Sequence, residues 1–178
     1  MMFRMNELVR LAEPDESRRD EFIAYCEEFR DAGEHVVHGQ LADAQADFAS
    51  LVRRWAQHAR GENLTEGQVP QTVCWLMLGS RILGTARFRH HLTEATFQEG
   101  GHVGYEVRPS ERRRGYATRL LALVLEKVRQ EDLKRLLLTC QKDNAPSIRV
   151  IEKNGGVLEN EITSPRTGKP ALRYWIEL

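Results

Sequence analysis

Residues 107–117 have the sequence VRPSERRRGYA, in which four arginines are set against one glutamate. A strand-like run of residues 102–108 leads into this turn, and an amphipathic helix follows it. The N-terminus of a helix has free backbone N–H groups and a partial positive charge, so it binds anions. Gly115 lacks a Cβ atom and Ala117 has a small side chain, so a phosphate can approach the backbone closely. The turn therefore predicts a pyrophosphate site.

The helix after the turn is the clearest in the sequence, because its apolar residues recur at helical spacing. They are Ala117, Leu120, Leu121, Val124, Leu125 and Val128. Arginine-rich turns are also common on solvated surfaces, and the pattern R-x-x-G-x-A alone is weak evidence for a phosphate site. The strand before the turn and the helix after it give the pattern its weight.

The rest of the chain alternates between helical and strand patterns. A strand is expected at residues 8–11, and two helices are expected around residues 22–29 and 41–55. Strands at residues 69–78 and 82–92 form a hairpin around Gly79-Ser80. A strand at 136–140, a helix at 144–154 and two strands at 157–162 and 172–178 complete the prediction. The order is β-α-α-β-β-β-α-β-α-β-β, an α/β fold with a mixed central sheet flanked by helices, in one domain covering residues 1–178.

The composition excludes several classes of protein. The 178 residues are 41% hydrophobic and carry a formal net charge of zero, which gives no reason to expect nucleic acid or a membrane as partner. The N-terminus lacks the apolar segment of a secretory signal, so we expect a cytoplasmic protein. The three cysteines are far apart and do not indicate disulfides. His90-His91 point to opposite faces of a strand, and His35-x-x-His38 lacks a third ligand, so no metal site is expected.

Two motifs carry a resemblance to a known family. Residues 112–117 resemble the Q/R-x-x-G-x-G/A motif of the GNAT superfamily of N-acetyltransferases. Asn144-x-x-Ser147 and Glu152-Lys153-Asn154-Gly155 resemble a second stretch of that family, and the separation of the motifs agrees. The resemblance is close over residues 101–156 and extends to the whole chain by element order.

The resemblance implies a binding site for acetyl-CoA, the acyl-donor cosubstrate. It implies that pyrophosphate is held by the backbone amides of Arg112, Arg113, Arg114, Gly115, Tyr116, Ala117 and Thr118. It also implies that Val107 hydrogen-bonds the pantetheine arm as an added strand would, and that Asn144 and Ser147 line the far side of the cleft. The cleft is then expected where the neighbouring parallel strands 102–108 and 136–140 splay apart.

Catalysis needs an amine without its proton, because an ammonium has no lone pair. Glu106 lies beside Val107 on the cleft strand and is the best candidate for the base, although a surface glutamate paired with a nearby arginine would give the same sequence pattern. Ile151 stands where many family members have a tyrosine that protonates the leaving thiolate. A thiol of pKa about 8.5 leaves readily, so a dedicated acid is optional. Cys140 is interpreted as a small buried hydrophobe and His102 as a structural residue.

The leading functional interpretation is an N-acetyltransferase that acts on a primary amine of a small molecule or peptide. The alternative is a GNAT-like sensor that binds acyl-CoA without turnover. A different nucleotide-binding protein is disfavoured, because neither G-x-x-x-x-G-K-S/T nor G-x-G-x-x-G occurs. We expect the N-terminal helices and the loop at residues 164–170 to shape the acceptor pocket. The oligomeric state stays open, with a homodimer as one option.

Overall fold

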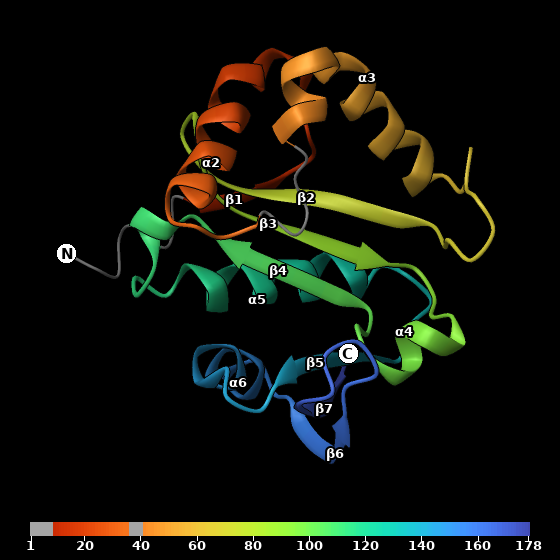
Figure 1. The fold of residues 1–178 in the computed structure, drawn as a ribbon. Helices are drawn as coiled ribbons and strands as arrows, with labels where there is room; N and C mark the ends of the chain where they lie inside the picture. Colours follow the sequence, from red (N-terminus) through yellow and green to blue (C-terminus); the bar gives the residue numbers. More distant parts are fainter. Residues whose placement is uncertain (1–8, 36–40) are drawn as a thin grey trace.

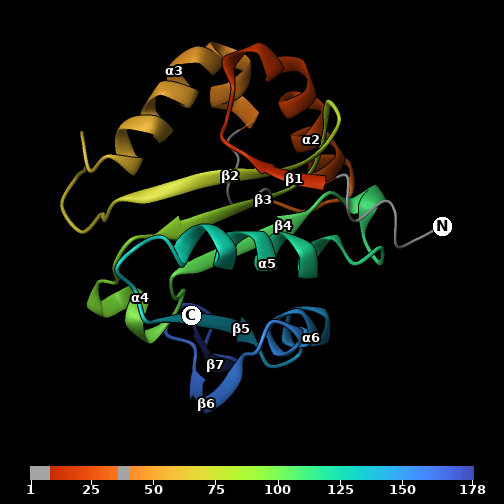
Figure 2. The same cartoon turned by 180° about the vertical axis from the view of Figure 1, so that it is seen from behind.

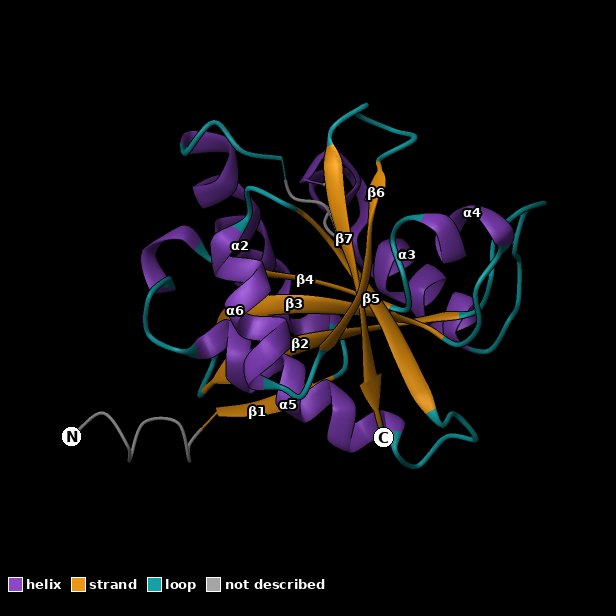
Figure 3. Cartoon of the chain, turned by 90° about the horizontal axis from the view of Figure 1, so that it is seen from below, coloured by secondary structure: helices purple, strands orange, loops and turns teal. Residues whose placement is uncertain are grey.

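The computed structural model describes residues 9–35 and 41–178, and its strands form two antiparallel sheets. The first sheet has the order β1-β2-β3-β4, and its strands are β1 (Val9–Ala12), β2 (Gln71–Leu78), β3 (Arg81–Arg89) and β4 (Val103–Val107). The second sheet has the order β5-β7-β6, and its strands are β5 (Arg135–Gln141), β7 (Pro170–Glu177) and β6 (Val157–Thr163). Figure 3 shows the strands of the second sheet crossing those of the first.

Helices cover both faces of the first sheet (Figures 1 and 2). The helices are α2 (Arg19–Asp31), α3 (Leu41–Ala59), α4 (Glu94–Gln98), α5 (Tyr116–Val128) and α6 (Ala145–Lys153). α2 and α3 pack on one face through an aromatic core that includes Phe22, Phe48 and Trp75. α5 packs on the other face, in a second core shared with β5, β7 and α6. Apart from the added helix α4, the predicted element order is confirmed over the described residues, as is the α/β fold with flanking helices. The expected mixed central sheet is instead two antiparallel sheets.

The differences from the prediction are local. The helix α4 and the 3-10 turns η1 (Glu16–Arg18) and η2 (Pro109–Glu111) were not predicted, because they are too short to show a hydrophobic period. The first strand begins at Val9 in the structure, and Leu8 lies outside the described residues. α3 is kinked at Asp47, where the backbone is extended (φ −155°, ψ 86°) and the side chain accepts a hydrogen bond from the backbone of Ser50.

The two sheets meet at the residue that precedes β4. The backbone N–H of His102 donates to the carbonyl of Leu137 (2.7 Å), and the Nδ1 atom of His102 accepts from the N–H of Leu137 (2.9 Å). A Cβ atom on Gly101 would lie 2.3 Å from the carbonyl oxygen of Leu137, so this approach requires glycine. β4 and β5 therefore meet at the start of β4 but belong to separate sheets, whereas the sequence predicted neighbouring strands of one sheet that splay apart.

Candidate functional site

A cavity of about 860 Å³ lies between the end of β4, the N-terminus of α5 and α6. Its walls include residues from all three elements and from the end of α2. The lining residues are Phe29, Glu34, His35, Tyr105, Glu106, Val107, Glu111, Arg112, Arg113, Gly115, Tyr116, Ala117, Thr118, Asn144, Pro146, Ser147, Arg149, Val150 and Lys153. Every residue predicted to bind the cofactor lies in this list except Arg114, and so does Glu106.

The N-terminus of α5 opens into this cavity without a side-chain cap. Its N-cap is Gly115 in the left-handed conformation (φ 82°), and the first turn contains no acidic residue. Arg113 also has a positive φ of 63°, which is uncommon for a residue with a side chain. The first-turn N–H groups of a 13-residue helix are therefore available to an anion. Arg113, Arg149 and Lys153 add positive charge to the same walls.

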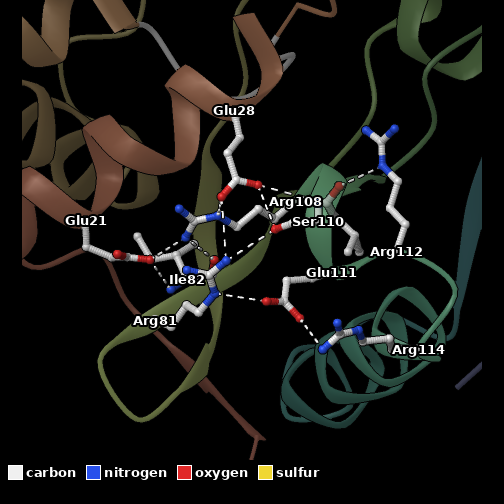
Figure 4. Close-up of polar contacts among 10 residues, drawn as sticks. Glu21, Glu28, Arg81, Ile82, Arg108, Ser110, Glu111, Arg112 and Arg114 are labelled. Atoms are coloured by element: carbon white, nitrogen blue, oxygen red, sulfur yellow. Dashed lines mark hydrogen bonds and ion pairs between the residues drawn. The ribbon is translucent and has the colours of Figure 1, made fainter. Parts of the chain in front are cut away.

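The arginines of the turn have different partners, as Figure 4 shows for Arg108, Arg112 and Arg114, so their charges do not add up at one place. Arg108 is 3% exposed and is paired with Glu21 (2.6 Å) and Glu28, away from the cavity. Arg114 is paired with Glu111 (3.2 Å) and is absent from the cavity lining. The sequence predicted that its backbone amide faces the cofactor, and the structure does not bring Arg114 to the cavity wall.

Arg112 does lie in the cavity, where its guanidinium forms a two-pronged ion pair. Its Nη1 and Nη2 atoms are each 2.7 Å from an oxygen of Glu34. Its Nε atom donates to the carbonyl oxygen of Val107 at 3.1 Å, and its guanidinium lies 5.5 Å from the centre of the Phe29 ring. Arg112 thus connects the turn before α5, the end of β4 and the segment that follows α2.

The α6 side of the cavity is built around Asn144 and Ser147. Asn144 is the N-cap of α6, and its side chain accepts from the N–H of Ser147 at 3.1 Å. The Ser147 hydroxyl lies 2.9 Å from the hydroxyl of Tyr105. Burial raises the pKa of Tyr105 to about 12, so its hydroxyl stays protonated at neutral pH. Both residues of the predicted far wall are therefore in place, and Tyr105 joins them.

Glu106 faces α2 from the opposite side of β4. Its carboxylate accepts hydrogen bonds from the hydroxyls of Thr85 (3.0 Å) and Tyr25 (3.3 Å). Tyr25 is completely buried, and burial raises its pKa well above the usual value, with the charge of Glu106 as a further cause. Glu106 is half-buried at the wall of the cavity. It is held by two neutral donors rather than extended into solvent, although its role as a base stays a prediction.

Ile151 is turned away from the cavity into the core, with 1% of its surface exposed. A Cβ atom on Gly156 would lie 2.4 Å from the side chain of Ile151, so the chain packs tightly there. The residue is therefore a packing residue in this chain. Cys140 is half-buried against the core, and burial raises the pKa of its thiol to about 11, which leaves it protonated at neutral pH.

Of the two segments expected to shape the acceptor pocket, the N-terminal one lines this cavity and the loop 164–170 does not. Phe29, Glu34 and His35 line the cavity, whereas no residue of the loop 164–170 does. That loop is bound to the end of α4 instead: Glu99 accepts from the Ser164 hydroxyl (2.8 Å) and pairs with Arg166 (2.9 Å). His38 lies outside the described residues.

Within residues 9–35 and 41–178, no group of three or more His, Cys, Asp or Glu side chains is placed to hold a metal ion. No helix of the described chain has the length and apolar character needed to cross a membrane.

Comparison with known proteins finds a family whose model matches most of the chain. A family model described as the acetyltransferase (GNAT) family matches residues 40–156, which include both sequence motifs and most of the cavity wall. The uncharacterized N-acetyltransferase YnaD of Bacillus subtilis (strain 168) is 31% identical over 75 residues. The aligned part is 42% of this chain and 42% of that protein.

Solved structures share the fold along nearly the whole chain. RimJ of Mycobacterium smegmatis, in complex with CoA-disulfide, gives a TM-score of 0.71 at 16% identity and covers 95% of this chain and 81% of its own. The self-immunity acetyltransferase MccE, in complex with acetyl-CoA and AMP, gives a TM-score of 0.70 at 13% identity. The alignment covers 98% of this chain and 95% of MccE. A Salmonella typhimurium acetyltransferase that modifies the N-terminal serine of a 50S ribosomal protein gives a TM-score of 0.67 at 16% identity. The alignment covers 96% of this chain and 95% of that protein. At these identities the similarity establishes the fold.

Proposed function

The chain belongs to the acetyltransferase (GNAT) family, and from this we propose that it transfers the acetyl group of acetyl-CoA to a primary amine. The family match confirms the resemblance inferred from the two motifs. One observation of the structure supports the proposal most: the uncapped N-terminus of α5 opens into a cavity with basic walls. A single-domain organisation, a cytoplasmic location and a homodimer stay predictions.

The cavity suits the donor in size and in chemistry. Its volume of about 860 Å³ is in the range of ligand sites, and its basic residues are grouped near the helix terminus. In the proposed arrangement the first-turn amides of α5 hold the pyrophosphate, and the end of β4 binds the pantetheine arm. Asn144 and Ser147 form the opposite wall. The donor supplies a thioester, whose carbonyl carbon the amine attacks.

The proposed chemistry needs little from the protein beyond placement and proton removal. The acceptor nitrogen forms a bond to the carbonyl carbon, and the carbon–sulfur bond breaks. Glu106 takes the proton of the amine directly or through a water, and a backbone N–H near Val107 stabilises the charge on the carbonyl oxygen. The thiolate leaves without a dedicated acid, which is consistent with the buried Ile151.

The acceptor is an amine on a small molecule or a peptide. One structural neighbour acts on the N-terminal serine of a ribosomal protein, and another is an aminoglycoside acetyltransferase. Both examples support amine chemistry in this fold, and their difference supports a search across both classes of acceptor.

Thermal unfolding with and without acetyl-CoA tests the binding step. At a concentration 100 times the dissociation constant, we expect acetyl-CoA to raise the free energy of unfolding by about 2.7 kcal/mol and Tm by roughly 5 to 10 °C. CoA should act similarly, and ATP should act less. Thiol release from acetyl-CoA with a panel of amines then tests turnover. No stabilisation at millimolar acetyl-CoA would overturn the proposal.

A sensor that binds acyl-CoA without turnover is the second candidate, because Ile151 occupies the position of the usual acid. This candidate requires stabilisation by acetyl-CoA together with no thiol release above the rate without protein for any amine. Mass spectrometry of the amine panel separates the two, because only the transferase produces acetylated amines.

A further inference from the structure

Arg112 occupies a complete cation-binding site inside the cavity. Glu34 supplies both carboxylate oxygens at 2.7 Å, the ring of Phe29 lies 5.5 Å from the guanidinium, and the carbonyl of Val107 accepts from Nε at 3.1 Å. A two-pronged carboxylate, an aromatic face and a carbonyl are the groups that recognise a cation in proteins. Glu34, Phe29 and Val107 all line the cavity, so the site can be reached from it.

This position of Arg112 conflicts with the proposed placement of acetyl-CoA. The carbonyl of Val107, proposed to bind the pantetheine arm, already accepts from Arg112. A carbonyl oxygen can accept two hydrogen bonds, but Arg112 itself lines the cavity beside Val107, so bound acetyl-CoA competes with its guanidinium for this oxygen and for the space around it. The ion pair of Arg112 and Glu34 does not prevent this, because their side chains are 41% and 45% exposed and ion pairs at such exposure contribute little to stability.

Once displaced, Arg112 has a new anion nearby. It stands in the turn just before the N-terminus of α5, where the pyrophosphate is proposed to lie. Arginine binds phosphate with the same fork that it offers to a carboxylate. Movement of the guanidinium to the phosphates leaves Glu34 and the face of Phe29 open to the cavity.

The uncovered site is negatively charged and lies on the same side as Glu106. The hydrogen bonds from Arg112 lower the pKa of Glu34 below its usual value of 4.5, and that usual value alone keeps the carboxylate ionised at neutral pH. The basic residues of the cavity, Arg113, Arg149 and Lys153, belong to the turn before α5 and to α6. The acidic lining residues Glu34 and Glu106 come from the segment after α2 and from β4, whereas Glu111 in the turn is paired with Arg81 and Arg114.

We propose that Glu34 and Phe29 form the subsite that recognises a positively charged group of the acceptor, and that Arg112 fills this subsite until acetyl-CoA binds. The inference rests on the proposed function and narrows it to acceptors that carry a second cation besides the reacting amine. It also makes the binding of the two substrates ordered, with acetyl-CoA first.

Binding of methylguanidine, which mimics the head group of Arg112, tests the subsite without turnover. By calorimetry or saturation-transfer NMR, methylguanidine should bind at least about tenfold more tightly to the CoA-saturated protein than to the free protein. In the absence of CoA, Arg112→Gln should show the same increase in affinity for methylguanidine, because the guanidinium that fills the subsite has been removed. The double variant that combines Arg112→Gln with Glu34→Gln should lose this increase in affinity for methylguanidine. Equal affinity in all four samples would overturn the proposal.

Glu62→Gln is the matched control for the loss of a carboxylate. Glu62 holds Arg60 with two contacts of 2.8 Å, as Glu34 holds Arg112, but it lies outside the cavity. The control should leave methylguanidine binding unchanged. The substituted side chains are half exposed, so the variants are expected to fold, and circular dichroism checks this. An Arg112→Ala variant provides a second form of the uncovered site.

Steady-state kinetics then separates recognition from a structural role. For 1,4-diaminobutane, Glu34→Gln should raise KM at least about tenfold with kcat unchanged, and for 1-aminobutane it should change neither. An equal loss with both amines would reduce Glu34 to a structural residue and overturn the proposal. Failure of the wild type to bind acetyl-CoA would instead refute the proposed function. Methylguanidine binding to Arg112→Gln in the absence of CoA would still test the cation site.

Discussion

Gly115 combines two requirements at one residue. Its φ of 82° suits glycine, and it is the N-cap of the helix proposed to hold the pyrophosphate. Gly115→Ala and Gly115→Asp both introduce a side chain in the left-handed region, at a cost of roughly 1 kcal/mol. Only Asp also introduces a negative charge beside the phosphates. We expect Asp to weaken acetyl-CoA binding roughly a hundredfold more than Ala.

Calorimetry with acetyl-CoA on both Gly115 variants measures this difference, and circular dichroism confirms that each is folded. The alanine variant controls for backbone strain. Equal dissociation constants for the two variants would show that the phosphates bind elsewhere.

Glu106 is the residue proposed as the base, and the structure defines the hydroxyl groups that donate to its carboxylate. Glu106→Gln keeps an oxygen that can accept from the hydroxyls of Thr85 and Tyr25, so the local structure should survive. If the carboxylate is the base, kcat should fall by roughly a hundredfold or more. The loss should shrink as the pH rises, because more of the amine is then neutral already. The affinity for acetyl-CoA should not change.

The measurement is kcat against pH for the wild type and Glu106→Gln with one accepted amine. Glu126→Gln is the control, because Glu126 is an exposed glutamate of α5 paired with Arg119. A Glu106→Gln enzyme with the kcat of the wild type across the pH range would leave Glu106 as a structural acceptor for two hydroxyls.

At the scale of elements, His102 joins β4 to β5 through a ring that must be neutral. Its Nδ1 atom accepts from the backbone of Leu137, so the proton of the neutral ring is on Nε2. Burial lowers the pKa of His102 to about 4 from the usual 6.5. Between pH 4 and pH 6.5, His102 is protonated in the unfolded chain but stays neutral in the folded chain. Stability therefore falls as the pH drops from about 6.5 to about 4, by up to about 3 kcal/mol for this group.

His102→Asn provides a comparison that separates this effect from other titrations. The Oδ1 atom of asparagine can accept from Leu137 as Nδ1 does, but it does not titrate. Urea unfolding at pH 7 and pH 4.5 should show a smaller loss of stability in the variant than in the wild type. The same loss in both proteins would show that other groups cause the acid sensitivity.

The order of elements could be predicted because each long element has its own period. α5 shows the helical period over its whole length, and the hairpin of β2 and β3 is marked by Gly79-Ser80. The sequence shows no such sign of how the strands divide between two sheets. That division depends on contacts between residues far apart, such as the approach of Leu137 to Gly101. Short elements like α4 contain too few residues for a period.

The positions of the site residues could be predicted, but their partners could not. The motifs placed Val107, Gly115 and Ser147 at one cavity. They could not show that Arg112 is held by Glu34, which is 78 residues away in sequence. Nor could they show that Arg108 is buried while Arg113 lines the cavity. A sequence motif predicts the backbone geometry of a site, whereas the direction of a long side chain depends on contacts across the whole fold.

At the scale of the molecule, a buried ion cluster joins the N-terminal helical layer to the proposed active site. Arg108 follows β4 directly, and its partners Glu21 and Glu28 belong to α2 (Figure 4). Glu28 also accepts from the hydroxyl of Ser110 at 2.7 Å, in the turn that leads to Gly115. The position of α2, which ends near the Glu34 subsite, is therefore fixed to the same turn that presents the α5 N-terminus.

Arg108→Gln should destabilise the whole fold rather than the site alone. The substitution leaves Glu21 and Glu28 without their buried cation, and loss of one partner of a buried pair costs roughly 3 to 5 kcal/mol. For a chain of this length, that corresponds to a fall in Tm of roughly 6 to 20 °C. Arg53→Gln is the control, because Arg53 pairs with Glu16 at 3.5 Å with both side chains about half exposed. An exposed pair contributes about 1 kcal/mol or less, so Tm should fall by no more than about 4 °C. Calorimetric unfolding of both variants at pH 7 gives the comparison, and equal shifts would mean that the cluster around Arg108 does not hold α2 against the sheet.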